Sequence, residues 1–169
     1  MLPNYVILAQ KYTEYDVKAA YLEKFTRFIE WPENTGMIDE STSFVLGIMG
    51  KTPLSSYIKK KYEKQEINNK NVEIRYISGF DQIDGCNLLF ISGTEYAQLD
   101  KIYLYLKNKP VLTICDDIRF SHKGIHIVLF IRDNHVYFEI DQNALDQSGL
   151  YANSLLMELS KTIITGEGG

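Results

Sequence analysis

Several features that would place this chain in a specialised class are scarce or missing. No apolar run approaches the roughly 18 residues of a membrane-spanning helix. Lys and Arg number 18 against 22 Asp and Glu and form no long stripe, which argues against a nucleic-acid surface. The two cysteines neither require nor exclude an oxidising compartment. Because internal repeats, low-complexity segments and linkers are also missing, the 169 residues predict one globular domain.

The two ends of the chain differ in character from the part between them. Tyr5–Ala9 is a short apolar run, and Leu8-Ala9-Gln10 resembles the end of a secretory signal, although no basic segment precedes it. Residues 1–15 are therefore either a signal-peptide remnant or a short packed arm. Residues 16–164 form the expected α/β domain, and the glycine-rich residues 165–169 are expected to be disordered.

A broad amphipathic helix is predicted from Asp16 to Pro32. Asp16 is the expected N-cap, and Pro32 is expected to end the helix because proline disfavours helical ψ in the preceding residue. Lys18 interrupts the apolar arc, so it either extends its ammonium group to solvent or marks a wet seam. The arc is wider than one sheet face requires. Four of its aromatic residues are therefore candidates for contact with a second subunit, unless the last helix covers the excess: Tyr21, Phe25, Phe28 and Trp31.

Strand-like and helix-like segments alternate along the middle of the chain. Apolar runs at 44–49, 87–92 and 111–115 are typical of strands buried on both faces, and 72–78 alternates as a more exposed strand does. Helices are expected from Thr52-Pro53 to about Gln65 and from Thr94 to about Asn108. This alternation predicts a parallel sheet with right-handed crossovers.

The C-terminal part predicts a hairpin followed by a helix. His126–Arg132 and His135–Asp141 flank the two-residue turn Asp133-Asn134. In that register one face of the hairpin is wholly apolar, while the other carries Phe130, Tyr137 and a cross-strand pair of His126 with Asp141. A final helix is expected over roughly 154–164.

Together these elements predict an α/β fold, a Rossmann-like or flavodoxin-like three-layer sandwich. Its mostly parallel sheet of four strands is extended by the C-terminal antiparallel hairpin to about six strands.

Candidate chemistry is sparse. Gly47–Thr52 ends like a phosphate-binding P-loop, but Val45 stands where that motif needs its first glycine, which leaves at most an anion site at the helix start. Cys115-Asp116-Asp117 with His122 and His126 nearby suggest a thiol nucleophile with a base, or a metal cluster, against the ordinary interpretation of packing and turn residues. No recognised ligand spacing or nucleophile–base–oxyanion set is present, so neither a metal, a cofactor nor catalysis is predicted.

The placement of the cysteines decides their pairing. Cys86 precedes one predicted strand and Cys115 ends the neighbouring one, which separates them by about 15 Å at ~3.3 Å per residue. A disulfide requires Cα atoms within about 7 Å. The sequence therefore predicts two free thiols.

A small ligand has one natural place in such a fold. Open α/β sheets bind ligands beyond the carboxyl ends of their strands. The polar residues expected there are also ordinary turn and cap residues, so both interpretations stay open: Lys51, Thr52, Ser78, Ser92, Asp116 and Asp117.

Several segments resemble the YfiR-like family of exported bacterial proteins between about Val17 and Leu159. They are VKAAYLEKFTRFIEWP, VLGIMGKTP, CNLLFIS, PVLTICD, and YFEID followed by LDQSGLYANSLLMEL. The resemblance implies a non-enzymatic periplasmic regulator that binds the periplasmic part of a membrane diguanylate cyclase, or of a histidine kinase, and controls its output. Two departures are Asp141, where the family usually has Asn, and fewer cysteines than redox-responsive members carry.

Three hypotheses follow. The leading one is an exported regulatory protein without cofactor, expected to be a homodimer, that acts through surface contacts. The second is a small-molecule sensor, and the third is a hydrolase that depends on Cys115. The residues expected to contact the partner or the second subunit are Tyr21, Phe25, Phe28, Trp31, Phe130 and Tyr137.

Overall fold

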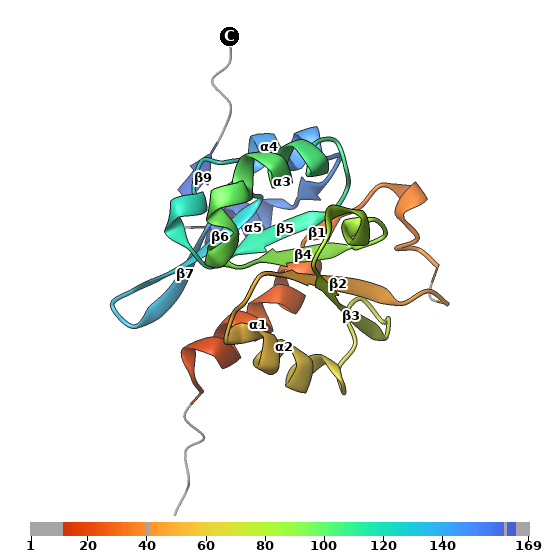
Figure 1. Ribbon diagram of the computed structural model, residues 1–169, viewed down its shortest axis with the longest axis horizontal. Coiled ribbons are helices and arrows are strands. Elements are labelled where there is room, and N and C mark those ends of the chain that lie inside the picture. The colour runs from red at the N-terminus through yellow and green to blue at the C-terminus, as the bar shows by residue number, and fades with distance from the viewer. Residues whose placement is uncertain (1–11, 40, 161, 165–169) are drawn as a thin grey trace, which may run out of the picture.

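The computed structural model describes residues 12–39, 41–160 and 162–164. In this part of the chain a seven-stranded sheet has helices packed on both faces (Figure 1). The strand order is β3-β2-β4-β5-β6-β7-β9. Its strands are β2 (Phe44–Met49), β3 (Val72–Ile77), β4 (Leu88–Ile91), β5 (Leu112–Cys115), β6 (Ile127–Arg132), β7 (His135–Asp141) and β9 (Thr162–Ile164). The helices are α1 (Glu14–Thr26), α2 (Leu54–Tyr62), α3 (Leu99–Leu106), α4 (Gln142–Gln147) and α5 (Ser154–Leu159).

The predicted α/β fold is confirmed. Strands β3, β2, β4, β5 and β6 are parallel, and β7 returns antiparallel to β6. The order of the first four matches the flavodoxin-like pattern, in which the chain moves outward from β2 first to one side and then to the other. The sheet gains one strand beyond the expected six, because residues 162–164 pair with β7 instead of continuing the last helix.

Two hydrophobic clusters lie on opposite faces of the sheet. One packs α1 and α2 against the even-numbered residues of β2, and includes Phe25, Leu46 and Ile58. The other packs α3 against the opposite face, and includes Ile102 and Leu89. All residues of β2, β4 and β5 are buried, as their continuous apolar runs predict.

The hairpin register is confirmed pair by pair. Ile127 lies opposite Ile140 and Leu129 opposite Phe138, and the turn residues Asp133 and Asn134 both have positive φ, of 48° and 60°. Such a turn twists in the same sense as the strands. Two further elements follow the hairpin where none was predicted: α4, and β8 (Tyr151–Ala152).

The first helix differs at both ends from its prediction. Thr13, not Asp16, is the N-cap, and Asp16 completes a capping box, its Oδ2 accepting from Thr13 N at 2.8 Å. The helix ends at Thr26 rather than at Trp31-Pro32. The reason is tertiary, because Ile29–Glu30 form a short strand, β1, that pairs antiparallel with β8, and Phe28 O accepts from Asn153 N.

Two other helices are shorter than expected. The hydroxyl of Thr52 accepts from Leu54 N at 3.1 Å, as a capping residue does, but α2 ends at Tyr62, before the expected Gln65. The segment Gly93–Gln98 is a 3-10 helix capped by Ser92, and only from Leu99 does an α-helix continue. Of the arm predicted at residues 1–15, residues 14 and 15 belong to α1, while residues 1–11 and the predicted tail at 165–169 lie outside the described residues.

His126 is not on an open face of the hairpin, which corrects the expected pair with Asp141. Its side chain is buried, and its Nδ1 accepts from Thr113 N at 3.0 Å. The proton therefore sits on Nε2, 3.0 Å from Ser148 Oγ. Asp141 instead accepts from Ala144 N and caps α4. At the base of this hairpin face α4 and the end of α3 surround His126, whereas the tip of the hairpin is exposed.

Lys18 is also buried rather than extended to solvent. Its Nζ lies 3.0 Å from Asp116 Oδ2, just beyond β5, and 2.5 Å from Glu14 Oε1. Burial by itself lowers the pKa of Lys18, but the contacts with these two carboxylates outweigh it and raise the pKa overall. The ion pair therefore holds α1 to the carboxyl end of the sheet.

The buried histidine predicts a pH-dependent stability. Burial lowers the pKa of His126 to about 4, from 6.5. Between these values the unfolded chain binds a proton that the folded chain does not, so this contribution is complete above pH 6.5 and is lost as the pH falls towards 4. Urea unfolding at pH 7 and pH 5.5 should differ by about 1 kcal/mol more in the natural chain than in His126→Gln. An equal pH dependence of stability in the two proteins would show that the pKa of His126 is not lowered on folding.

The buried ion pair predicts an asymmetric double-mutant cycle. Lys18→Met leaves Asp116 without its cation and should lower the free energy of unfolding by about 3 kcal/mol. Lys18→Met combined with Asp116→Asn should cost less than the sum of the two single changes, because the unpaired charge at Asp116 is then removed, and Glu14 is 45% exposed to solvent. Urea denaturation measures all four proteins, and additive losses would show that the pair has no coupling energy.

Candidate functional site

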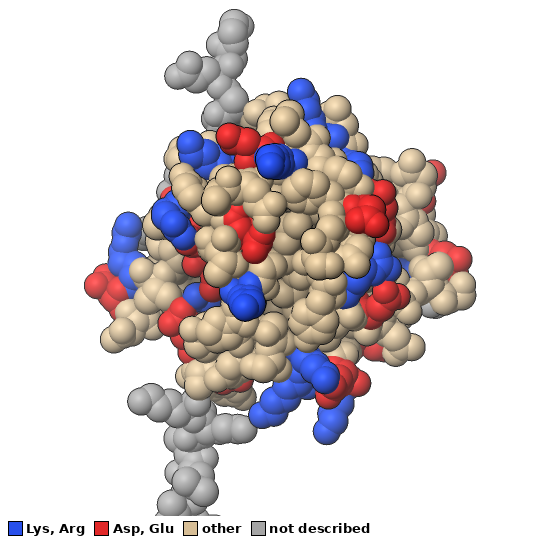
Figure 2. All heavy atoms as spheres, in the orientation of Figure 1, with Lys and Arg blue, Asp and Glu red and all other residues tan. Residues whose placement is uncertain are grey.

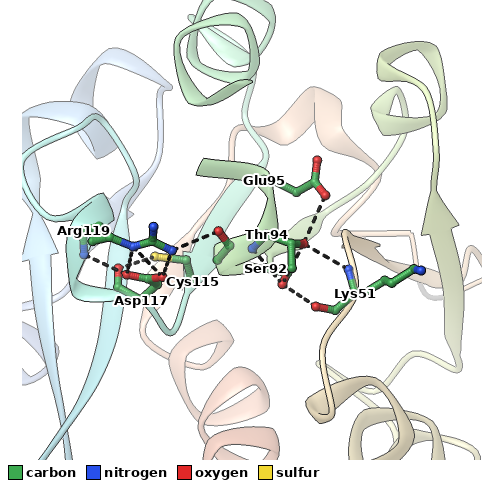
Figure 3. A network of polar contacts seen from close by, with 8 residues as sticks. Lys51, Ser92, Thr94, Glu95, Cys115, Asp117 and Arg119 are labelled. Atoms are coloured by element: carbon green, nitrogen blue, oxygen red, sulfur yellow. Dashed lines mark hydrogen bonds and ion pairs between the residues drawn. The ribbon is translucent and has the colours of Figure 1, made fainter. Parts of the chain in front are cut away.

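The carboxyl ends of β2, β4 and β5 form the place where an open α/β sheet binds ligands. The chain leaves β2 towards α2 on one face and leaves β4 towards α3 on the other, so the strand order reverses between these two strands. The polar residues of the turns that follow the strands meet there (Figure 3).

The turns after β2 and β4 bind directly to each other. Ser92 Oγ donates to Lys51 O at 2.6 Å, and Lys51 N donates to Thr94 Oγ1 at 3.2 Å (Figure 3). Gly50 has a φ of +84°, and a Cβ there would lie 2.6 Å from Thr94 Oγ1 and 2.7 Å from Glu95 Oε1. The glycine is required for this close approach of the two turns.

The turn after β5 closes the other side of the network. Asp117 accepts from Arg119 N and from the Arg119 guanidinium, with Nη2 2.6 Å from Oδ2. These hydrogen bonds lower the pKa of Asp117. The same guanidinium donates to Gly93 O at 3.2 Å and lies over the ring of Tyr96. Asp117 is therefore neutralised within the chain and ties the turns after β4 and β5 together.

The predicted ligand residues thus fall into two groups. Lys51, Ser92 and Asp117 meet in one network, although Lys51 takes part through its backbone while its side chain extends away into solvent (Figure 3). The other three have separate structural partners, which are Leu54 N for Thr52, Gln82 Oε1 for Ser78, and Lys18 for Asp116. The sequence analysis did not identify Glu95 or Arg119. The position of Arg119, two residues after Asp117, could have indicated an ion pair between them.

The cysteines lack the environment of a nucleophile. The structure confirms that both are free, and both are buried. Burial raises the pKa of Cys115 and of Cys86, so both stay protonated thiols near neutral pH. His126 cannot act as a base towards Ser148, because the nitrogen facing Ser148 carries the proton. Within 12–39, 41–160 and 162–164, no three His, Cys, Asp or Glu side chains are grouped to hold a metal ion.

Two grooves run along α1 and were not predicted. One, of about 560 Å³, lies along the surface between α1 and α2 and is lined by Lys60, Lys61 and Lys64. Figure 2 shows basic side chains gathered on this side of the molecule, below α2. The other groove, of about 440 Å³, lies between the start of α1 and the tip of the β6–β7 hairpin, with Tyr21 and Ile131 in its walls.

The six aromatic residues expected to contact a partner lie on two sides of the sheet. Phe25 is 1% exposed and packs on Phe138 with ring centroids 4.9 Å apart, which leaves it no surface for a partner. Three others are half-buried against the same cluster: Tyr21, Phe28 and Trp31. Phe130 and Tyr137 stack on each other at 5.8 Å on the opposite face of the hairpin.

One solved structure supports the fold. The ABC domain in complex with L-Trp from Streptococcus pneumonia superposes with a TM-score of 0.55 over 84% of this chain, at 8% sequence identity. This chain spans 61% of that domain, and at such low identity the likeness concerns the α/β fold alone. A protein of unknown function from the DUF364 family of Pyrococcus horikoshii gives a TM-score of 0.34 at 11% sequence identity. That alignment covers 69% of this chain and 53% of the Pyrococcus chain.

Comparison by sequence identifies the family. No curated protein matches the chain significantly. A family model described as YfiR/HmsC-like, however, matches residues 15–161, nearly the whole of the chain. This match covers the helix, the strands and the hairpin that carry the resemblance in the sequence. Membership of this family indicates a regulatory protein of cyclic-di-GMP signalling in the periplasm. The chain belongs to the YfiR/HmsC-like family.

Proposed function

We propose that this chain is a non-enzymatic periplasmic regulator that binds the periplasmic part of a membrane diguanylate cyclase and modulates its output. A histidine kinase is the alternative partner of the same kind. The observation that carries the proposal is the family match over residues 15–161. The interlocked turns at the carboxyl ends of the strands support it, since their polar groups are used within the chain, as in a protein that acts through its surface.

The groove between α1 and the hairpin is the best candidate for the partner surface. The hairpin extends beyond the body of the sheet beside the start of α1 (Figure 1). Its apolar face is therefore buried only near the base, and Ile131 is 42% exposed although it lies on the same face as Ile127. Tyr12 is 73% exposed, and half-buried Tyr21 and Val136 complete the apolar walls. Aromatic and aliphatic pockets of this kind are typical anchor points of protein interfaces.

No membrane-spanning helix is found among the described residues, because none is long and apolar enough. The partner supplies the membrane part in this proposal. A tagged chain incubated with detergent-solubilised envelope extracts should recover a membrane diguanylate cyclase or histidine kinase, identified by mass spectrometry, and its addition should change that enzyme's rate. Recovery of cytoplasmic proteins only, without any membrane signalling enzyme, would overturn the proposal.

The groove predicts a specific loss of binding. Ile131→Glu places a charge in the apolar wall and should weaken partner binding at least tenfold, as removal of an interface anchor does. The matched control is Leu104→Glu, because Leu104 is 68% exposed on α3, which packs on the opposite face of the sheet. Affinity is measured by biolayer interferometry, and thermal unfolding verifies that both variants fold. Equal loss in both variants, or in neither, would exclude this groove.

A further inference from the structure

Strand β3 has a free edge. Within the part of the chain that the structure describes, it is the outermost strand of the sheet and pairs only with β2 (Figure 1). Backbone groups along a free edge are a template for a further strand, and proteins normally protect them with charges, proline or a covering loop. The sequence of β3, Val-Glu-Ile-Arg-Tyr-Ile, contains no proline and carries one charge of each sign.

The pairing with β2 fixes which backbone groups face outward. Phe44 N donates to Asn71 O at 2.8 Å, and residues alternate along a strand, so Glu73 and Arg75 also point their backbone groups towards β2. The N–H and C=O groups of Val72, Ile74 and Tyr76 therefore point to the free edge. No hydrogen bond elsewhere in the described chain uses these outward groups.

The order of side chains in β3 is self-complementary. If a second β3 runs antiparallel with Ile74 opposite Ile74, then Glu73 lies opposite Arg75, and Val72 lies opposite Tyr76. Opposite charges and aromatic–β-branched pairs are both favourable across strands. In this register the residues with outward N–H and C=O groups also lie opposite each other. Ile74 can therefore exchange hydrogen bonds with Ile74 of the second copy, and Val72 with Tyr76.

Neighbouring registers lack this complementarity. Moving the axis to Glu73 would place Glu73 opposite itself, and moving it to Arg75 would place Arg75 opposite itself. Like charges directly opposite each other are destabilising. The charge pattern thus favours the axis at Ile74 over these two neighbours.

We propose that a second copy of this chain pairs antiparallel along the edge of β3, with the twofold axis at Ile74, so that the two sheets become continuous. A second copy is favoured over an unrelated strand because the twofold repeats each favourable pair, as an isologous interface requires. The new contacts cover Tyr76, which is 58% exposed in the single chain, with Val72 of the second copy.

The charged residues are already held in position for this contact. Arg75 Nη1 donates to Gln82 O at 3.2 Å and Asp84 O at 2.9 Å, and Arg75 Nη2 lies 2.9 Å from Glu73 Oε1. The two side chains remain 31% and 50% exposed, so each can accept a second partner. Because the guanidinium is fixed by the chain itself, little further side-chain ordering is needed on association.

Charge reversal tests the pairing. The natural chain should sediment at twice its 19.5 kDa mass, whereas Glu73→Arg or Arg75→Glu should weaken the dimer at least tenfold, by placing like charges opposite each other. The double variant Glu73→Arg with Arg75→Glu restores opposite charges and should restore the dimer. Thermal unfolding verifies the fold of each protein. A monomeric natural chain, dimeric single variants or a monomeric double variant would each overturn the proposal.

Disulfide trapping tests the register. Glu73 and the opposite Arg75 form a non-hydrogen-bonded pair, with Cα atoms about 4.5 Å apart, within disulfide range. A mixture of Glu73→Cys and Arg75→Cys proteins should therefore form a covalent dimer on mild oxidation, and the mixed pair keeps one natural Glu–Arg contact.

Neither cysteine variant alone should cross-link, because its two new cysteines are offset along the strands by two residues, about 7 Å, which puts their Cα atoms about 8 Å apart. The natural Cys86 and Cys115 are buried and give little background. Equal cross-linking in the mixture and in the separate proteins, or none in the mixture, would exclude this arrangement. Both experiments need only the purified chain, so their outcome is independent of the membrane partner.

Discussion

The burial of both faces of β2, β4 and β5 is the constraint on which the rest of the structure depends. Every residue of these strands is buried, so each face of the sheet needs its own covering layer. The α1–α2 layer and the α3 layer supply the two hydrophobic clusters. Because α1 packs against the sheet, Lys18 on α1 is buried. Its ammonium group is stabilised there by the carboxylates of Glu14 and Asp116.

The same architecture accounts for the character of the carboxyl edge of the sheet. In many open α/β proteins the crevice at this edge is a ligand site. Here the turns that form it are bound to one another by Ser92, Thr94 and the Asp117–Arg119 pair. The polar groups that would bind a ligand instead hold the ends of three strands in place, which suits a family whose members regulate other proteins.

The surfaces that remain lie at different edges of the sheet. The hairpin groove is near the β7 end of the strand order, whereas β3 is the strand at the other end. An antiparallel association of two copies along β3 therefore leaves the groove of each copy uncovered. The fold thus separates the proposed self-association from the proposed contact with a membrane protein.

Some parts of the structure follow from local sequence patterns. The hairpin register follows from Asp133-Asn134, because a two-residue turn with positive φ fixes which residues lie opposite each other. The two free thiols follow from strand spacing. Other parts do not, and the end of α1 is the clearest case. Residues 27–31 continue the helical pattern, yet they leave the helix because Ile29–Glu30 pair with β8, more than a hundred residues later in the chain.

The sequence by itself determined the α/β class, the parallel strands with their two buried faces, the hairpin register and the family. The fold class, the buried strands and the hairpin register depend on apolar periodicity and turn chemistry, which act over a few residues, whereas the family rests on the resemblance of whole segments. Only the tertiary structure decided that His126 and Lys18 are buried, that the predicted ligand residues have partners within the chain, and that β3 has a free edge. Burial, ion pairing and strand order depend on contacts between segments far apart in the chain, and no local pattern encodes them.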